Sequence, residues 1–417
     1  MGESTRTKRS HDIDLGGGAG LRGRDFVLLL AAMFAAFASF APLLSVVPLW
    51  AVAGGAGEAG AGATTGVFML VTVLTQVGMP WLARRVSYRA ALGAGAVLLG
   101  VPALLYPASA EFLPVIVVSA LRGVGFGLLT VAGSTLVARL VPPSQRGRGV
   151  SLYGLAVGLP NLVFLPGGVW AAQHLGYLPV FVAAGVLPLL ALLAALAMNG
   201  DRGSRNPGDP APTEAVRPDT PRRGHGSGRL LLRLAAPWTI LVSATLAGGA
   251  LVTFLPLALA RAGTGVAPAA LFAFSLAMIA ARGGAGVISD RTGSAWLLAP
   301  ALGAGGLGMA GLAFAVAVER PGLVAVAAVV AASLYGFGFG ALQNGTLVVM
   351  FGRVGPSGYG TASAAWNVAF DAGTGLGAVA FGLLVESWGY APGFAVAATL
   401  VAACVPVALS VARRPGG

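Results

Sequence analysis

The sequence has few charged residues and very few acids. Only 10% of its 417 residues are charged, whereas soluble domains carry about a quarter, and Asp and Glu together number 14. This deficit argues against a water-soluble protein. The chain has a single cysteine, Cys404, which excludes a disulfide framework and a cysteine-based metal site.

Motifs of ATP-driven and catalytic proteins are also missing. No G-x-x-x-x-G-K-[ST] loop is present, so the sequence encodes no ATP-driven mechanism. Three lone charges in apolar segments, with no histidine–carboxylate set, argue against an intramembrane enzyme. We therefore expect no enzymatic activity, no cofactor and no metal.

Long apolar runs make up most of the chain, which is 56% hydrophobic with a mean hydropathy of +0.83. A membrane helix needs about 20 mostly apolar residues. These runs are too long for β-strands and do not alternate. The sequence predicts an all-α integral membrane protein with twelve transmembrane helices, at about 26–50, 64–83, 89–108, 112–138, 149–172, 177–198, 234–258, 267–288, 295–316, 322–350, 358–385 and 390–411.

One polar stretch interrupts the apolar segments. Residues 199–228 are rich in Gly, Pro and Arg, which is typical of a flexible linker. The stretch divides the chain into two sets of six helices. The predicted organisation is an N-terminal tail at 1–25, a six-helix bundle at 26–198, a linker at 199–233, a second bundle at 234–411 and a tail at 412–417.

The basic residues predict the orientation in the membrane. All but four of the 26 Lys and Arg residues fall in the two tails, the linker and the loops on that side. Only Arg261 and Arg320 lie in loops on the other side. Because Lys and Arg concentrate in cytoplasmic loops, we expect both termini to be cytoplasmic, in the cell membrane. The pI of about 11.1 then reflects topology and attraction to anionic lipid rather than nucleic-acid binding.

The two halves repeat each other. At an offset of 213, residues 125–181 fall without gaps on 338–394, and the aligned identities include GFG, Pro, Tyr and Phe. At an offset of 206, PWLARRVS at 80–87 falls on GVISDRTG at 286–293. The pattern predicts two bundles related by a pseudo-two-fold axis normal to the membrane. Transporters built in this way bind substrate between the halves.

GVISDRTG resembles the signature of the major facilitator superfamily, approximately G-x-L-A-D-R-x-G-R-R, and the resemblance extends over essentially the whole chain. Gly286, Asp290, Arg291 and Gly293 fit its second copy. The resemblance implies the major facilitator fold and a conformational latch, in which Asp290 holds the opposite half when the cytoplasmic side is closed. An acid at a helix C-terminus needs a compensating partner. The expected partners are Arg146 and Arg148, at the start of the fifth helix.

The first copy of the signature departs from the pattern. Arg85 fits, but Arg84 stands in place of the acid and Ser87 in place of the second glycine. We therefore expect the two interfaces between the halves to be held unequally. GLPNLVFLPGGVW, in the fifth helix, partly resembles the glycine-proline signature of drug–proton antiporters: Pro166 fits, whereas Leu165 replaces a glycine. The resemblance is closest to proton-coupled drug or metabolite efflux transporters.

Three charges lie inside predicted membrane segments. A charge near the bilayer midplane costs at least a few kcal/mol, so Arg122, Arg282 and Asp371 are functional candidates. Asp371 is the best proton carrier, since an acid that meets Arg in one state and water in another can bind and release protons. The alternative is a fixed ion pair with Arg282 or Arg122. Asn367 lies one turn earlier on the same helix face, towards the expected cavity, whereas Gly373 and Gly377 lie on the opposite face and are expected to pack against a neighbouring helix.

Other polar residues in the membrane segments can line the cavity or form ordinary interhelical hydrogen bonds. They are Gln76, Asn161, Tyr335, Gln343 and Asn344. Gln76 is the repeat partner of Arg282, and Tyr335 is the repeat partner of Arg122.

These features predict a secondary transporter. The first hypothesis is proton-coupled export of a drug or secondary metabolite by alternating access. The alternative is proton-coupled uptake of a small polar or anionic solute. The presence of two intramembrane arginines and only one intramembrane acid favours this alternative. A receptor that binds without transport is a third class. The expected partners are a small-molecule substrate, protons and the lipid bilayer, with no nucleic acid, and the chain is expected to be a monomer.

Overall fold

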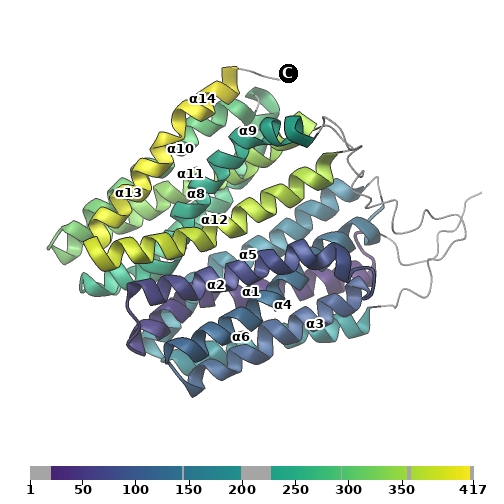
Figure 1. The fold of residues 1–417 in the computed structure, drawn as a ribbon, viewed down its shortest axis with the longest axis horizontal. Coiled ribbons are helices and arrows are strands. Elements are labelled where there is room, and N and C mark those ends of the chain that lie inside the picture. The colour runs from purple at the N-terminus through teal and green to yellow at the C-terminus, as the bar shows by residue number, and fades with distance from the viewer. Residues whose placement is uncertain (1–19, 143–144, 199–226, 293, 355–357, 414–417) are drawn as a thin grey trace, which may run out of the picture.

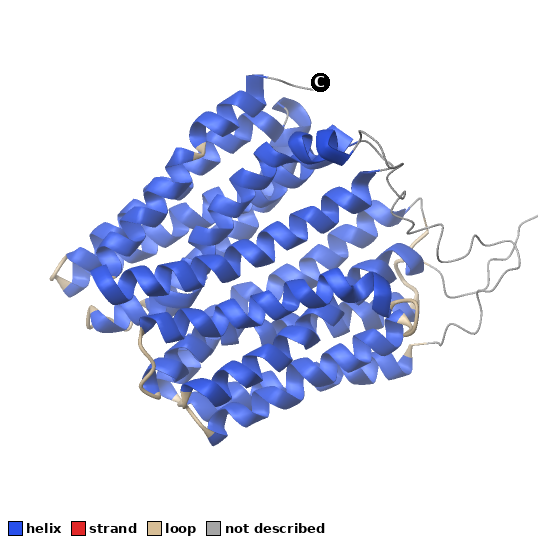
Figure 2. Ribbon diagram, in the orientation of Figure 1, coloured by secondary structure: helices blue, strands red, loops and turns tan. Residues whose placement is uncertain are grey.

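The computed structural model describes residues 20–142, 145–198, 227–292, 294–354 and 358–413. Every regular element in these ranges is a helix (Figure 2). Twelve helices within them are long and apolar enough to cross a membrane. The predicted all-α fold with twelve membrane helices is confirmed.

The first half contains six of these spans, and its third span changes helix type part-way. Pro102 has no N–H to donate to the preceding turn, and there the α-helix gives way to a 3₁₀-helix. The elements are α1 (Arg24–Ala53), α2 (Glu58–Leu82), α3 (Tyr88–Gly100), η1 (Val101–Ala108), α4 (Phe112–Leu140), α5 (Arg146–His174) and α6 (Tyr177–Ala197).

The second half contains the other six spans. Its last span is broken at Cys404, two residues before Pro406, which again lacks a backbone donor. The elements are α8 (Ser227–Arg261), α9 (Ala267–Thr292), α10 (Ser294–Ala317), α11 (Pro321–Val354), α12 (Tyr359–Trp388), α13 (Tyr390–Ala403) and α14 (Val405–Arg413).

Two helices begin six or seven residues earlier than predicted, because a helix can continue past the bilayer where hydropathy no longer marks it. α8 begins at Ser227 rather than at residue 234, and α2 begins at Glu58 rather than at residue 64. Residues 199–226 of the predicted linker lie outside the described ranges. The domain boundaries drawn around it stay a prediction.

The helices pack as two similar bundles. Figure 1 shows α1–α6 on one side of the molecule and α8–α14 on the other. In the first bundle α1 packs on α5 and α6, while α4 packs on α2 and α3. In the second bundle α8 packs on α12 and α13, while α11 packs on α9 and α10. Because each contact in one bundle has its repeat counterpart in the other, the predicted pseudo-two-fold relation is confirmed.

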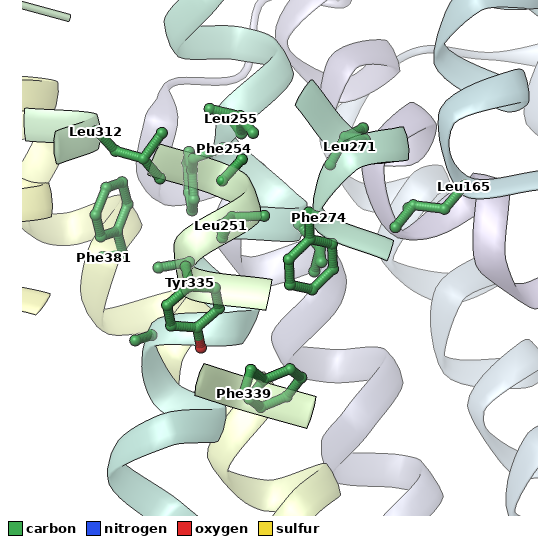
Figure 3. Close-up of a cluster of buried hydrophobic side chains, with 14 of the residues drawn as sticks. Leu165, Leu251, Phe254, Leu255, Leu271, Phe274, Leu312, Tyr335, Phe339 and Phe381 are labelled. Carbon is green, nitrogen blue, oxygen red and sulfur yellow. The ribbon is translucent and has the colours of Figure 1, made fainter. Parts of the chain in front are cut away.

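The bundles meet along two equivalent helix pairs, α2 with α12 and α5 with α9, and α1 also contacts α8. A cluster of buried apolar side chains joins them. Figure 3 shows Leu165 of α5 in this cluster with Leu271 and Phe274 of α9.

The molecule has two ends, which differ in their charge. The basic end is where α1 begins at Arg24 and α2 ends at Leu82, and the distal end is where α1 ends at Ala53 and α2 begins at Glu58.

Candidate functional site

The two halves are in close contact in the distal part of their interface. Ser45 of α1 donates a hydrogen bond to the carbonyl of Val252 on α8. The hydroxyl groups of Thr65 and Thr253 lie 3.2 Å apart. Gly62 of α2 packs so closely on α12 that a Cβ there would overlap the carbonyl oxygen of Ala378.

Charged residues reinforce this closure at the distal end. The Glu58 carboxylate lies 2.6 Å from the Arg261 guanidinium of the other half, which also lies over the Tyr390 ring. Glu386 of α12 accepts a hydrogen bond from the Ala59 N–H at 2.9 Å. This contact caps the N-terminus of α2, where the helix dipole favours a negative charge. We name these contacts the distal network.

The residues of the distal network are not among those predicted from the sequence. Glu58, Arg261 and Glu386 stand at helix ends, where charged residues usually face water. The sequence contains one signal for these contacts: residues of opposite charge lie at the same predicted end of helices that belong to different halves.

Towards the basic end the halves separate. In the described stretch from 150 to 159 of α5, no residue is buried. A Cβ on Gly154 or Gly158 would meet nothing within 4 Å. Further along the same helix, Leu165 is buried against the other half. The interface is therefore open at the basic end and closed at the distal end.

Arg282 of α9 faces this opening rather than lipid. The outward stripe of α9 contains Phe272, Leu276 and Ala280, all exposed. Arg282 is two residues beyond Ala280, so it lies about 200° around the helix. It is nevertheless exposed. An exposed side chain on the face away from lipid lies in the open part of the interface.

Asp371 forms a direct link between the halves. Its Oδ2 accepts a hydrogen bond of 2.8 Å from Nε2 of Gln76 on α2. Gln76 Nε2 also lies 3.2 Å from the Thr130 hydroxyl of α4. The Asp371 side chain is buried, with the residue 8% exposed. In the described part of the chain it forms no ion pair with Arg282 or Arg122, so the predicted fixed pair is absent from this conformation.

The surroundings of Asp371 on α12 agree with the predicted helix faces. Asn367 is exposed and donates to the Ser363 carbonyl of its own helix. On the opposite face, a Cβ on Gly373 would overlap the Thr245 hydroxyl of α8. The glycines thus pack against a neighbouring helix, while Asn367 lies beside the opening.

The polar residues around Arg282 pack it against α11. Nη1 of Arg282 lies 3.4 Å from Oε1 of Gln343, and Nε2 of Gln343 lies 3.6 Å from the Met278 sulfur. Asn344 donates to the Arg282 carbonyl at 3.2 Å. Asn161, on α5, donates to the Val157 carbonyl of its own helix. Three of the predicted cavity residues therefore form ordinary hydrogen bonds with protein groups.

Arg122 occupies a separate, enclosed position within the first half. It is only 2% exposed, and its Nε donates to the Leu99 carbonyl at 3.0 Å. Its guanidinium lies 5.7 Å from the Phe68 ring and 5.9 Å from the Tyr106 ring. It lines a cavity of about 20 Å³, the scale of one water molecule. Its repeat partner Tyr335 is also enclosed and donates to the Ala244 carbonyl.

The predicted latch is only partly visible. Gly293 lies outside the described residues, as do the side chains of Asp290, Arg291 and Arg146. Three further latch arginines are exposed: Arg84, Arg85 and Arg148. Arg85 lies over the Trp81 ring at 4.3 Å. The latch stays a prediction.

Two positions of the signature do have visible structural roles. Gly286 packs against α11, where a Cβ would lie 3.3 Å from the Asn344 amide nitrogen. Ser87, which replaces a glycine, accepts a hydrogen bond from the Ala90 N–H and caps α3. The serine therefore starts a helix where the family pattern has a glycine turn.

No cluster of three or more His, Cys, Asp or Glu residues exists in the described part of the chain. The site consists of one acid, two arginines and neutral polar groups, arranged between and within two bundles. Such groups can exchange a proton or bind a charged solute.

Comparison with known proteins identifies the family. The model of the Major Facilitator Superfamily matches residues 28–378. The solved structure of the nucleoside transporter NupG is similar, with a TM-score of 0.73 at 14% identity, covering 94% of this chain and 99% of that one. A bacterial homologue of the human lysosomal transporter Spinster, in an inward-facing and occupied conformation, has a TM-score of 0.71 at 12% identity, covering 93% and 96% of the two chains. A search of curated proteins by sequence found no match.

Proposed function

Because the chain belongs to the major facilitator superfamily and is a transporter that works by alternating access, we propose that it couples proton movement to the export of a small organic molecule. The observation that carries the proposal is the hydrogen bond between Asp371 and Gln76. It joins an ionisable group to the interface that must rearrange during transport.

The coupling follows from where this bond lies. Gln76 belongs to the first half and Asp371 to the second, so relative movement of the halves changes the surroundings of the carboxyl group. Burial, hydration and hydrogen bonding all change the free energy of protonating a carboxyl group. Proton binding at Asp371 therefore favours one conformation over the other, which is the requirement for coupling.

Two further features support an organic substrate and export. Beside Asp371, the Trp366 and Phe370 rings stack at 5.3 Å, and both residues are only partly buried. These aromatic surfaces suit an apolar molecule. With the basic end on the cytoplasmic side, as the loop arginines favour, the opening faces the cytoplasm, where an exporter loads.

Proton-coupled uptake of a small polar or anionic solute is the second candidate. The observation that favours it is Arg282, an exposed residue that has no ion pair with a described acid. Export and uptake share the same proton site and differ in the sign of the coupled flux.

The test is proton flux in proteoliposomes that contain a pH-sensitive dye, with a panel of organic compounds added under an imposed pH gradient. We expect compound-dependent proton movement in the wild type and none in Asp371→Asn. Glu111→Gln, which removes an exposed acid in a distal-end loop, serves as the control and should behave as wild type.

The direction of proton movement relative to the compound distinguishes export from uptake. If Asp371→Asn still moves protons with the compound, the carboxyl group is a structural element, and the proposed coupling through Asp371 is wrong.

A further inference from the structure

Two polar contacts in the structure are repeat counterparts of each other. In the first half, Gln76 of α2 lies 3.2 Å from Thr130 of α4. In the second half, Arg282 of α9 lies 3.4 Å from Gln343 of α11. The sequence offsets that relate the halves map Gln76 to Arg282 and Thr130 to Gln343. The same pair of helix positions therefore forms the same contact in both bundles.

The two contacts differ in one respect: only the contact in the first half includes a third residue, from the opposite half. In the first case Asp371, from the opposite half, completes the contact by binding Gln76. The offset of 213 maps Asp371 to Gly158 of α5, the helix that packs on α9. Glycine offers no acid, and a Cβ on Gly158 would meet nothing within 4 Å. Among the described residues, Arg282 therefore lacks the carboxylate that its counterpart has, and open space surrounds Gly158, the position equivalent to Asp371.

The charge of Arg282 makes this gap significant. A guanidinium has five N–H donors, and among the described residues the one side-chain partner of Arg282 is a neutral amide oxygen at 3.4 Å. Among the described residues it forms no ion pair. Its exposed position faces the opening between the halves, where a solute can reach it. Closing the basic end would remove this charge from water, which is unfavourable unless an anion accompanies it.

We propose that Arg282 and the open space at Gly158 form a subsite for the acidic group, a carboxylate or a phosphate, of an organic solute. The solute's acid occupies the place that the repeat assigns to an aspartate. Arginine suits this role because its planar donors bind carboxylate and phosphate in a bidentate manner. The inference rests on the proposed transport function in one respect, namely that the bound acid is the transported molecule.

The repeat suggests a decisive variant. Gly158→Asp supplies a carboxylate from the chain itself at the position equivalent to Asp371, and it should compete with the solute's acid for Arg282. Gly158→Asn adds a side chain of nearly the same size without the charge, so it is the matched control. Arg282→Gln removes the guanidinium directly, and Arg282→Lys keeps a positive charge without the bidentate geometry.

The experiment is calorimetric titration of the purified full chain with three acids (benzoate, 1-naphthoate and 1-naphthyl phosphate). Benzyl alcohol, 1-naphthalenemethanol and 1-naphthylmethylamine are the neutral and cationic comparisons. We expect at least one acid to bind the wild type at least tenfold more tightly than its uncharged analogue. Its affinity should fall at least tenfold in Arg282→Gln and in Gly158→Asp, less in Arg282→Lys, and little in Gly158→Asn.

Three results would overturn the proposal: no acid binds the wild type, the neutral analogues bind equally well, or Arg282→Gln and Gly158→Asp retain full acid affinity. Melting temperatures check that each variant is folded. If Arg282→Gln does not fold, the comparison of Gly158→Asp with Gly158→Asn is sufficient to test the subsite. The titration needs no proton gradient. An acid that binds at Arg282 while proteoliposomes show no coupled flux would therefore support this subsite and count against the proposed transport.

Discussion

Gly62→Ala should shift the protein towards a conformation that is open at the distal end. Gly62 belongs to the first half and touches Ala378 of the second. A methyl group at residue 62 would overlap the Ala378 carbonyl oxygen, which is fixed by the α12 backbone and cannot turn aside as a flexible side chain can. The overlap exists only while the distal ends of the halves are together.

The size of the shift follows from this overlap. Overpacking a close contact by one methyl group costs about 1–3 kcal/mol. The gain in helix propensity from Gly to Ala, up to about 1 kcal/mol, applies in both conformations and cancels from their ratio. The equilibrium between distal-closed and distal-open forms should therefore move roughly 5- to 150-fold towards the open form.

The assay is a spin-label distance measurement between the distal loops of the two halves. Cysteines at Glu111 and Glu319, both exposed, carry the labels. The native Cys404 is buried, and Cys404→Ala removes it from the background. Gly62→Ala should increase the population with longer label–label distances.

Gly377→Ala is the matched control. Its Cβ would overlap the Leu246 carbonyl oxygen, but both residues belong to the second half. We expect this variant to lower the melting temperature without changing the distribution of distances. If Gly62→Ala behaves in the same way, the contact at Gly62 does not distinguish the two conformations, and the reasoning is refuted.

Two smaller effects are also expected. Glu58→Gln should shift the same label distances towards the open form by up to about fivefold. The Arg261 side chain of this ion pair is 65% exposed, and such pairs contribute up to about 1 kcal/mol. An unchanged distribution would mean that the ion pair does not hold the distal end. Tyr335→Phe should lower the free energy of unfolding by about 1 kcal/mol, since the hydroxyl donates to the buried Ala244 carbonyl. Thermal denaturation measures this loss, the label distances should stay as in wild type, and an unchanged melting temperature would contradict the assignment.

The fold was predictable because its signals are local and repeated. Each membrane helix is marked by its own apolar length, and the match of 125–181 with 338–394 relates the two bundles without any knowledge of packing. Helix ends were less predictable. Hydropathy marks the part of a helix that lies in lipid, so the early start of α8 at Ser227 had no apolar signal.

The partners of the charged residues were not predictable in the same way. Asp371 binds Gln76, 295 positions away, rather than an arginine. That choice depends on how the two bundles dock, which is a property of neither helix alone. The faces of α12 could be predicted, because Asn367 and the glycines follow from helix periodicity within one segment.

The cap on α2 ties the folding of a helix end to the transport cycle. The residue before the helix, Gly57, provides no side-chain cap, and the Ala59 N–H instead binds Glu386 of the other bundle. When the distal ends separate, that amide has to exchange its carboxylate partner for water. The first turn of α2 should then fray, so its backbone amides should exchange hydrogen faster in the distal-open form. Secondary structure at this one turn is thus a property of the conformation and not of the sequence around it.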